Sequence, residues 1–515
     1  MDPLAKKCLE TSVEAIIDAG VNPKSLAGTR TAVYAIYDFS EFEMSVVDGQ
    51  SQRALLGIAR TFAANRLSFT LDLKGPSFAA LGGFGQTFHF IDEAKGQLEE
   101  GKIDAAVIVT ANYIMSPRSL AILHSMGLAA DDGKCRSFDE NAHGYSRSEG
   151  CVAFFLQRSP EARRNYATVI GAEYRFFGTK EGSVLAFDGG PAKEMLRQLY
   201  SKWNVDPADV GYIEADGSGI KDRDAKEVDI LSDVFCRKRR KPLLIGSVKS
   251  NMGHAEAAAC AVGAVKAIIA LKNTKIPPNI NISSPIPELT FRGIKVVMEP
   301  TPYDEELIGI NSIGFAGHFG HLLLKGNPKK SSSALIEENL PQIILLSSRT
   351  ESGIIDVMKR VKETKITPEF ASLVNGVFSQ EVQNHMYRGY AIVTSDNTHV
   401  TSKSQRTDGS HRPIWWVFSG MGSQWNGMGS QLMHIPIFRD VIDRCDSVLA
   451  PHGLDIKHIL TSKDKDIFDN ILHAFVGITA VQLGFVEILR ALKLEPEGIV
   501  GHSVGELGVL TPITV

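Results

Sequence analysis

The chain has 515 residues, of which 43% are hydrophobic and 22% are charged, and its formal net charge is −4. This length allows about three domains, and the composition is that of a globular protein with a sizeable core. The charge excludes an overall attraction to nucleic acid or to an anionic membrane surface, so neither is expected as a partner.

Residues 1–328 alternate between strand-like and helical patterns. A helix is predicted at Leu4–Gly20, and strands are predicted at Arg30–Tyr37, Ala105–Ala111, Cys151–Gln157, Ala167–Tyr174, Pro242–Ser250 and Ile294–Pro300. Near-continuous apolar strands that alternate with helices predict an α/β fold whose sheets are covered on both faces. The run Ala257–Leu271 is short and contains Lys266, so it predicts a buried helix and no membrane span.

Two polar stretches, Gly326–Pro341 and Lys403–Pro413, predict boundaries in the rest of the chain. The segment between them predicts a small α/β module with a strand at Arg388–Thr394. A third α/β unit begins with the strand-like run Ile414–Gly420. We therefore predict three domains, at residues 1–328, 329–410 and 411–515.

Six scattered cysteines form no Cys-x-x-Cys pair, which argues against a disulfide framework and against a structural zinc site. No metal is expected, and a reduced cytoplasmic compartment fits this pattern. The N-terminus lacks the apolar core of a signal peptide. The basic run Arg237–Lys241 is either a solvated loop or a contact or targeting patch.

The stretch KGPSFAALGGFGQTFH (Lys74–His89) predicts a loop that presents one side chain at the start of a helix. Gly82, Gly83 and Gly85 crowd this loop. Phe84 stands where a nucleophile would sit, and its side chain has no nucleophilic atom.

Six stretches resemble, in this order, the ketosynthase domain of animal-type fatty acid synthases and of related polyketide synthases: MDPLAKKCLETSVEAIIDAG, NRLSFTLDLKGPSFA, CRSFDENAHGYSRSEG, YIEADGSGIKDRDAKEVD, IGSVKSNMGHAEAAAC and GINSIGFAGHFGHLLL. The resemblance implies a thiolase-like layered α/β fold and a homodimer. In that family an acyl chain held on a cysteine condenses with malonyl carried on an acyl carrier protein. Two histidines donate to the thioester carbonyl, and a lysine supports them. Acyl-CoA, malonyl-CoA and the phosphopantetheine of an acyl carrier domain are the implied substrates, with no cofactor bound directly.

Mapped residue by residue onto that family, the chain departs at two catalytic positions. Phe84 replaces the cysteine and Asp216 replaces the first histidine, whereas Lys249 and His254 remain, and Phe315 matches the gating phenylalanine. Without a thiolate no acyl-enzyme can form, and an ionised carboxylate would repel a developing enolate. The two retained residues are either inherited structural residues or keep a binding or weak decarboxylating role.

The run GIVGHSVGELG (Gly498–Gly508) reads as a strand, a Gly-x-Ser-x-Gly turn and a helix start. An ordinary α/β-hydrolase is the rival interpretation, but FSGMGSQWNGMG (Phe418–Gly429) resembles the opening motif of malonyl/acetyl transferases. The resemblance implies a partial α/β-hydrolase-like acyltransferase segment, with Ser503 as nucleophile and Gln424 and Val504 as the oxyanion hole. The family's catalytic histidine is not reached by Val515, and we expect His473 to be a helix residue with no catalytic task.

Both ends of the sequence depart from the family pattern, so we expect a fragment of a longer gene product or an incomplete gene model. Two functions remain open. In one, the parent is an acyl-transferring synthase that loads acyl groups through Ser503. In the other, the chain is a non-catalytic paralogue that keeps the fold for dimerisation or for binding acyl chains or acyl-CoA.

Overall fold

A computed structural model of the chain describes residues 1–37, 40–42, 57, 59, 61–81, 83–178, 186–290, 292–327, 341–382, 384–394 and 401–513, and Gly82 therefore lies outside the described residues. The chain forms two compact units. The first comprises Met1–Ser331 with Glu369–Gln383, and the second comprises Ser332–Pro368 with Asn384–Val515. The segment expected as a linker, residues 329–410, is thus divided between the two units.

The first unit contains a four-stranded sheet with the order β2-β1-β3-β4, in which β4 runs antiparallel to β3. Its strands are β1 (Thr31–Ile36), β2 (Ser77–Ala80), β3 (Ala105–Asn112) and β4 (Gly150–Leu156). The helices of this half are α1 (Pro3–Asp18), α4 (Phe62–Thr70), α5 (Gln86–Glu99) and α6 (Pro117–Ser125). The strands predicted in this half and the first helix are confirmed to within two residues at each end.

The second sheet has the order β5-β12-β11-β6-β7-β9. Its strands are β5 (Ala167–Phe176), β6 (Tyr212–Glu214), β7 (Leu243–Gly246), β9 (Ile294–Val296), β11 (Leu307–Ile313) and β12 (His318–Gly326), and a small pair joins β8 (Lys275–Ile276) to β10 (Thr301–Pro302). The helices are α7 (Gly189–Lys202), α8 (Lys221–Phe235), α9 (Val248–Met252) and α10 (Ala259–Asn273).

The predicted strand Pro242–Ser250 is wrong in its second half. The strand ends at Gly246 because the hydroxyl of Ser247 accepts a hydrogen bond from the backbone N–H of Lys249 and caps α9. The predicted strand Ile294–Pro300 also ends early, at Val296. The helix predicted from Ala257–Leu271 is confirmed as α10, and Lys266 inside it is buried with its ammonium 2.9 Å from a carboxylate oxygen of Glu214.

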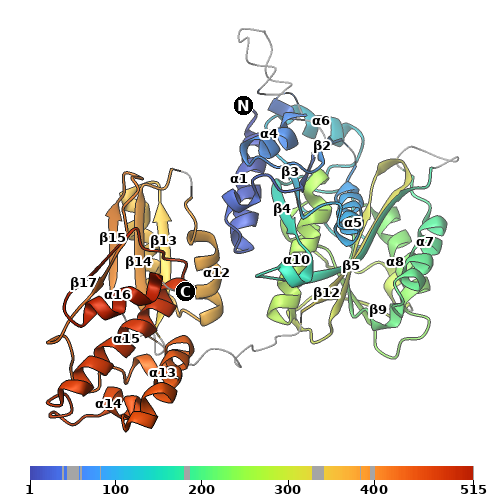
Figure 1. Cartoon of the computed structure of the whole chain (residues 1–515). Helices are drawn as coiled ribbons and strands as arrows, with labels where there is room; N and C mark the ends of the chain where they lie inside the picture. Colours follow the sequence, from blue (N-terminus) through green and yellow to red (C-terminus); the bar gives the residue numbers. More distant parts are fainter. Residues whose placement is uncertain are drawn as a thin grey trace. The chain divides into compact units, whose positions relative to one another are not determined.

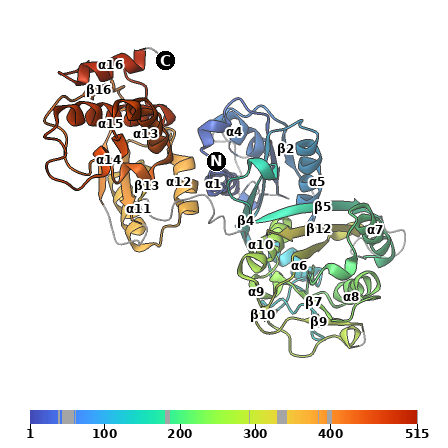
Figure 2. The same cartoon turned by 60° about the horizontal axis from the view of Figure 1, so that its bottom comes forward.

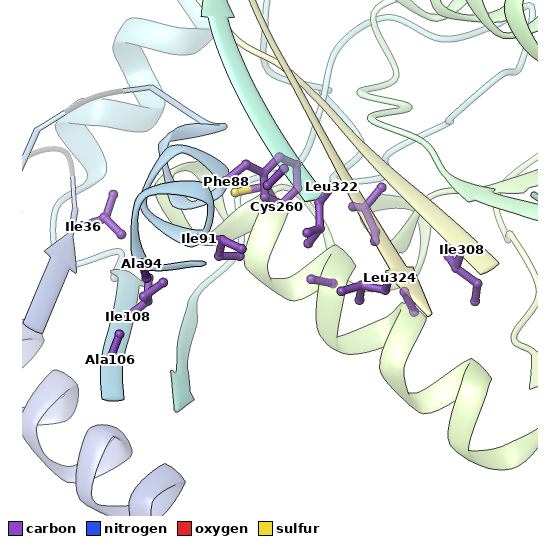
Figure 3. Packing of buried hydrophobic residues seen from close by; sticks show 14 of the residues in the cluster. Ile36, Phe88, Ile91, Ala94, Ala106, Ile108, Cys260, Ile308, Leu322 and Leu324 are labelled. Carbon is purple, nitrogen blue, oxygen red and sulfur yellow. The ribbon is translucent and has the colours of Figure 1, made fainter. Parts of the chain in front are cut away.

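The helices α5 and α10 lie between the two sheets and form the central layer of the first unit (Figures 1 and 2). Figure 3 shows Phe88, Ile91 and Ala94 of α5 and Cys260 of α10 packed among strand residues of both sheets. The helices α1 and α4 cover the outer face of the first sheet, and α7 and α8 cover the outer face of the second. The unit is therefore a five-layer α/β sandwich, and the prediction that its sheets are covered on both faces is confirmed.

The second unit holds an antiparallel sheet β13-β14-β15 beside α11, and a parallel pair β16-β17 followed by α16. Its strands are β13 (Gln342–Ser348), β14 (Tyr387–Val393), β15 (Ser402–Arg406), β16 (Trp415–Phe418) and β17 (Gly498–Gly501). Its helices are α11 (Glu351–Glu363), α13 (Pro436–Leu449), α14 (Ile456–Thr461), α15 (Ile471–Ala491) and α16 (Gly505–Ile513).

Helix α12 (Pro368–Phe378) packs with the first unit, where the side-chain amide of Asn22 donates to the carbonyl of Val377 at 2.7 Å. Among the described residues, α15 is long and apolar enough to cross a membrane by length and composition. A share of 33% of its apolar window is buried inside the structure, and this share includes Ala480 and Val486 in the cores of the second unit.

We predict that Phe88→Ala lowers the free energy of unfolding of the first unit by about 3–5 kcal/mol, because the fully buried ring fills space between the sheets. Urea unfolding followed by circular dichroism measures the loss. The matched control is Phe69→Ala, in which the ring is 88% exposed, and we expect a change of less than about 0.5 kcal/mol. Equal losses in the two variants would contradict the central position of α5.

Candidate functional site

Phe84 lies in the turn between β2 and α5, at the position where the sequence pattern places a nucleophile. Its side chain is buried, with 5% of its surface exposed. The next residue must be glycine, because a Cβ on Gly85 would lie 2.7 Å from the ring of Tyr174. The turn therefore directs an aromatic ring inward at the N-terminal end of the central helix.

The ring of Phe84 packs edge-on against two residues that the sequence analysis assigned to the same site. Its centroid lies 4.6 Å from that of His254 and 5.0 Å from that of Phe315. The guanidinium of Arg223 lies over the other ring, 5.0 Å from the centroid of Phe315. The aromatic cluster fills the space in front of the turn and holds the expected gating residue against Phe84.

Asp216 and Lys249 form a buried ion pair, with 2.6 Å between the Lys249 ammonium and the Asp216 carboxylate. The same ammonium donates to the backbone carbonyl of Asp216 at 2.8 Å. The backbone N–H of Ile313 donates to the carboxylate at 3.0 Å. The carboxylate of Asp216, which the sequence analysis assigned to the position of the family histidine, thus neutralises the charge of Lys249.

A second layer of buried polar groups supports this pair. Both carboxylate oxygens of Glu227 accept backbone N–H groups, from Asp216 at 2.8 Å and from Gly217 at 2.9 Å. The amide of Asn311 also donates to Glu227, at 2.9 Å. Burial and the nearby charge of Asp216 raise the pKa of Glu227 to about 7, although these hydrogen bonds act in the opposite direction.

Three charged residues of α8 at the site were not assigned by the sequence analysis: Arg223, Asp224 and Glu227, all of which are buried. Burial raises the pKa of Asp224 to about 7. The sequence contains a pattern that could have identified them, because these charged residues share the buried side of α8 with the apolar residues Val228 and Leu231. Charged side chains at the apolar positions of a helix indicate a paired or functional cluster.

His254 is neutral at this site. Burial, together with the charges of Lys249 and Arg223, lowers its pKa well below the usual value. The backbone N–H of Glu256 donates to Nδ1 at 2.9 Å, so the ring proton is on Nε2 and the imidazole can donate one hydrogen bond. A single donor of this kind can polarise a carbonyl, but it cannot form a covalent intermediate.

No described residue offers a thiolate in place of the missing cysteine. Cys260, the cysteine of the central layer, is buried, and burial raises the pKa of its thiol to about 11. It is protonated at neutral pH and is a core residue, as its apolar run predicted. In the described part of the chain, no group of three or more His, Cys, Asp or Glu side chains could hold a metal ion.

The predicted elbow around Ser503 is present in the second unit. Ser503 is exposed and has a φ of 54°, a backbone conformation that only a constrained turn imposes on serine. Gly505 must lack a side chain, because a Cβ there would lie 2.1 Å from the carbonyl oxygen of Phe418. The strained backbone of Ser503 and the close packing of Gly505 against β16 together place the Ser503 hydroxyl at the start of α16.

The residues expected as the oxyanion hole flank this elbow. The strands β16 and β17 are parallel neighbours, so the loop that carries Gln424 and the turn that carries Ser503 leave the same edge of the sheet. Val504 follows the serine and is buried, and a Cβ on Gly420 would lie 2.9 Å from the Cβ of Ser503. This arrangement brings the loop of Gln424 and the elbow to one edge of the sheet, and the oxyanion hole itself stays a prediction.

The elbow has no general base among the residues that the structure describes. Among the described residues, the Ser503 hydroxyl has no hydrogen-bond partner. His473 lies in α15, and its Nδ1 atom is 2.8 Å from the carbonyl oxygen of Ile467. The ring of His473 therefore contacts the local backbone, as expected for a helix residue. The serine is positioned for nucleophilic attack, but no described side chain takes its proton.

We predict that Lys249→Met lowers the free energy of unfolding of the first unit by about 3–5 kcal/mol, because it leaves the Asp216 carboxylate buried without its counter-ion. The double variant Asp216→Asn with Lys249→Met should recover more than half of the loss. The control is Glu10→Gln at the exposed pair with Lys6, which should change stability by less than about 0.5 kcal/mol. Similar losses in the double and single variants would contradict the pairing.

Family models match four consecutive segments of the chain. They are the N-terminal domain of beta-ketoacyl synthase over residues 1–162 and its C-terminal domain over residues 166–283. The ketoacyl-synthetase C-terminal extension follows over residues 279–392, and the acyl transferase domain over residues 415–513.

Relatives of the chain include the 6-methylsalicylic acid synthase of Aspergillus terreus (strain NIH 2624 / FGSC A1156), which is 30% identical over 98% of this chain and 30% of that protein. The 5-methyl-1-naphthoate synthase of Streptomyces sahachiroi is 30% identical over the same two shares. The hybrid PKS-NRPS synthetase pytA of Aspergillus terreus (strain NIH 2624 / FGSC A1156) is 28% identical over 98% of this chain and 83% of that protein. The chain thus spans about a third or less of the length of the first two relatives.

Solved structures with the same fold include the oxazolomycin ketosynthase domain OzmH KS7 of Streptomyces albus JA3453, with a TM-score of 0.70 and 22% identity over 79% of this chain and 76% of that one. The ketosynthase from module 6 of the bacillaene synthase of Bacillus subtilis 168 gives a TM-score of 0.67 at 24% identity, over 77% and 69% of the two chains. These likenesses confirm the predicted thiolase-like fold.

Proposed function

We propose that the ketosynthase half of this chain keeps the architecture of a ketosynthase but does not condense acyl units. The premise is that the chain is a ketosynthase–acyltransferase region like those of type I polyketide and fatty acid synthases. The observation that carries this proposal is the position of Phe84. Its buried ring stands at the start of the central helix, in contact with His254 and Phe315. A condensing site needs a thiolate at that position to receive the acyl chain.

Asp216 supports the proposal independently. Decarboxylation and condensation develop negative charge on the thioester oxygen, and hydrogen-bond donors must stabilise that charge. The carboxylate of Asp216 faces Lys249 and is an acceptor, so it removes one donor and occupies the lysine. His254 alone retains a donating N–H.

The experiment that tests the proposal uses the full chain, radiolabelled acyl-CoA and malonyl carried on an acyl carrier domain. We expect no labelled thioester and no 3-oxoacyl product. Phe84→Cys alone should not restore condensation, because Asp216 still replaces a donor. Phe84→Cys with Asp216→His should recover labelling of the new thiol, and Phe84→Ala with Asp216→His is the matched control that lacks the thiol.

Peptide mapping by mass spectrometry locates the label. A 3-oxoacyl product from the unmodified chain would overturn the proposal. Full condensation by the single Phe84→Cys variant would show that Asp216 does not matter. An unlabelled double variant would contradict the claim that these two positions account for the loss.

Acyl transfer through Ser503 is the chemistry that the second unit supports, on the strength of the strained elbow and the adjacent loop of Gln424. We propose acyl-CoA, malonyl-CoA and the phosphopantetheine of an acyl carrier domain as its substrates, in a cytoplasmic protein without a bound cofactor. A fatty acid product, as in the animal-type synthases, is the narrower proposal, whereas the relatives named above include a hybrid PKS-NRPS synthetase.

We predict that the chain forms an acyl ester at Ser503 from acyl-CoA only slowly, and that free imidazole accelerates the reaction by supplying the missing base. Hydroxylamine-sensitive label on the peptide with Ser503 measures the ester. Ser503→Ala should abolish the imidazole-dependent label. Rapid labelling without imidazole would reveal a base that the described residues do not contain, and label that survives in Ser503→Ala would exclude this serine.

A scaffold role through a homodimer is the second candidate function, favoured by the exposed edge strand β2. Phe78 on this strand and Leu81 just after it are each 56% exposed, and β2 ends the first sheet. An apolar sheet edge of this kind is a pairing surface.

We predict that Phe78→Lys with Leu81→Glu converts a dimer to a monomer in sedimentation velocity at micromolar concentration, because both changes place charge on the sheet edge. Val448→Glu, at a 66% exposed position of the second unit, is the control and should leave the dimer intact. A monomeric parent chain, or a dimer that survives the double change, would contradict a β2 interface.

A further inference from the structure

The first unit brings together two cysteines that lie far apart in the sequence. Cys8 lies on the buried face of α1, within the core cluster that joins this helix to the first sheet. Cys151 is the second residue of β4 and packs against the same cluster. The two thiols are hydrogen-bonded to each other where α1 packs on β4, and both are free of disulfides.

The two sulfur atoms differ in their access to solvent. Cys8 is buried, with 1% of its surface exposed, whereas Cys151 is half-buried. An open groove between α1 and β4 is lined by Thr11, Glu14 and Ala153. Because alternate residues of a strand share one face, Cys151 is on the same face of β4 as Ala153 and lies beside this groove. A small reagent that enters from solvent therefore meets Cys151 before Cys8.

The side chains of α1 favour a thiolate on Cys151. The hydrogen bond with Cys8, a second one with the hydroxyl of Thr11 and the charge of Lys7 lower the pKa of Cys151, although burial acts in the opposite direction. The hydrogen bond with Cys151 and burial both raise the pKa of Cys8. Since the thiolate is the reactive form of cysteine, Cys151 is the nucleophile of the pair and Cys8 is its protonated neighbour.

We propose that Cys8 and Cys151 form a redox-active dithiol, which a hydroperoxide closes to a disulfide and a thiol reductant opens again. The Cys151 thiolate attacks one peroxide oxygen, the O–O bond breaks, and the leaving hydroxide takes a proton to become water. The sulfur of Cys8 then attacks the resulting sulfenic acid, the S–O bond breaks, and a second water leaves as the S–S bond forms. The two thiols lose two electrons and two protons, and one hydrogen peroxide is reduced to two waters.

The dithiol lies on the side of the first sheet that α1 covers, and it involves neither the Phe84 site nor Ser503. The proposal therefore stands or falls independently of the proposed acyl chemistry. It is also compatible with a reduced compartment, because the disulfide forms only when peroxide is present and a dithiol reverses it.

The test treats the folded full chain with hydrogen peroxide, blocks the remaining thiols and maps the cysteine peptides by mass spectrometry without reduction. Peroxide is raised until Cys236 and Cys445 are also oxidised. These two cysteines are half-buried like Cys151, but burial raises the pKa of each thiol. We expect Cys151 to be oxidised at least about fivefold faster than either of them. The main product should be a peptide that links Cys8 to Cys151 and is released by dithiothreitol.

The variant Cys8→Ser removes the second thiol, so the sulfenic acid at Cys151 should persist and be trapped by dimedone. The matched control is Cys260→Ser, which removes another buried thiol of the same unit and should leave the link intact. The mapping of the unmodified chain needs no variant, so it tests the proposal whether or not Cys8→Ser folds.

Three results would overturn the proposal. They are loss of the Cys151 thiol without the linked peptide, oxidation of Cys236 or Cys445 before Cys151, and a sulfenic acid that persists equally in the unmodified chain and in Cys8→Ser.

Discussion

The first unit depends on the close fit of one helical layer between two sheets. The residues of α10 that face the sheets are small, and a Cβ on Gly263 would already lie 3.3 Å from Glu214. Larger side chains would push the sheets apart and open the core. Because α5 begins beside Phe84, and because Lys249 and His254 lie just before α10, the same fit determines where the site residues stand.

Each of the two residues that depart from the family pattern meets a separate physical requirement of the buried site. A lysine buried without a partner is costly, and the Asp216 carboxylate supplies the counter-charge at 2.6 Å. A cavity at the turn would also be costly, and the ring of Phe84 fills it against His254 and Phe315. Lys249 is therefore paired and the space in front of the turn is filled, without the groups that a condensing site would use.

The second unit holds a locally built elbow around Ser503. The elbow places Ser503 at a φ of 54° because glycine neighbours permit the close approach of β16 and the turn. This geometry is local, since it needs only the strand, the turn and the first residues of α16. A proton acceptor is a long-range requirement, and none of the described residues meets it. A nucleophile can thus be positioned by a short segment, whereas its activation depends on residues distant in sequence.

The sequence by itself determined the alternation of strands and helices, the turn that carries Phe84 before α5 and the elbow at Ser503, because periodicity and local turn chemistry depend on neighbours in the chain. It missed the end of β7 at Gly246, since the cap by Ser247 competes with an apolar run that looks like a strand. It also left Arg223, Asp224 and Glu227 unassigned. Only the tertiary structure decided that Asp216 pairs with Lys249, that Phe84 touches Phe315 and that Cys8 meets Cys151, because each contact joins segments far apart in sequence. Such contacts are set by how the sheets and the central helices pack, and no local pattern encodes that packing.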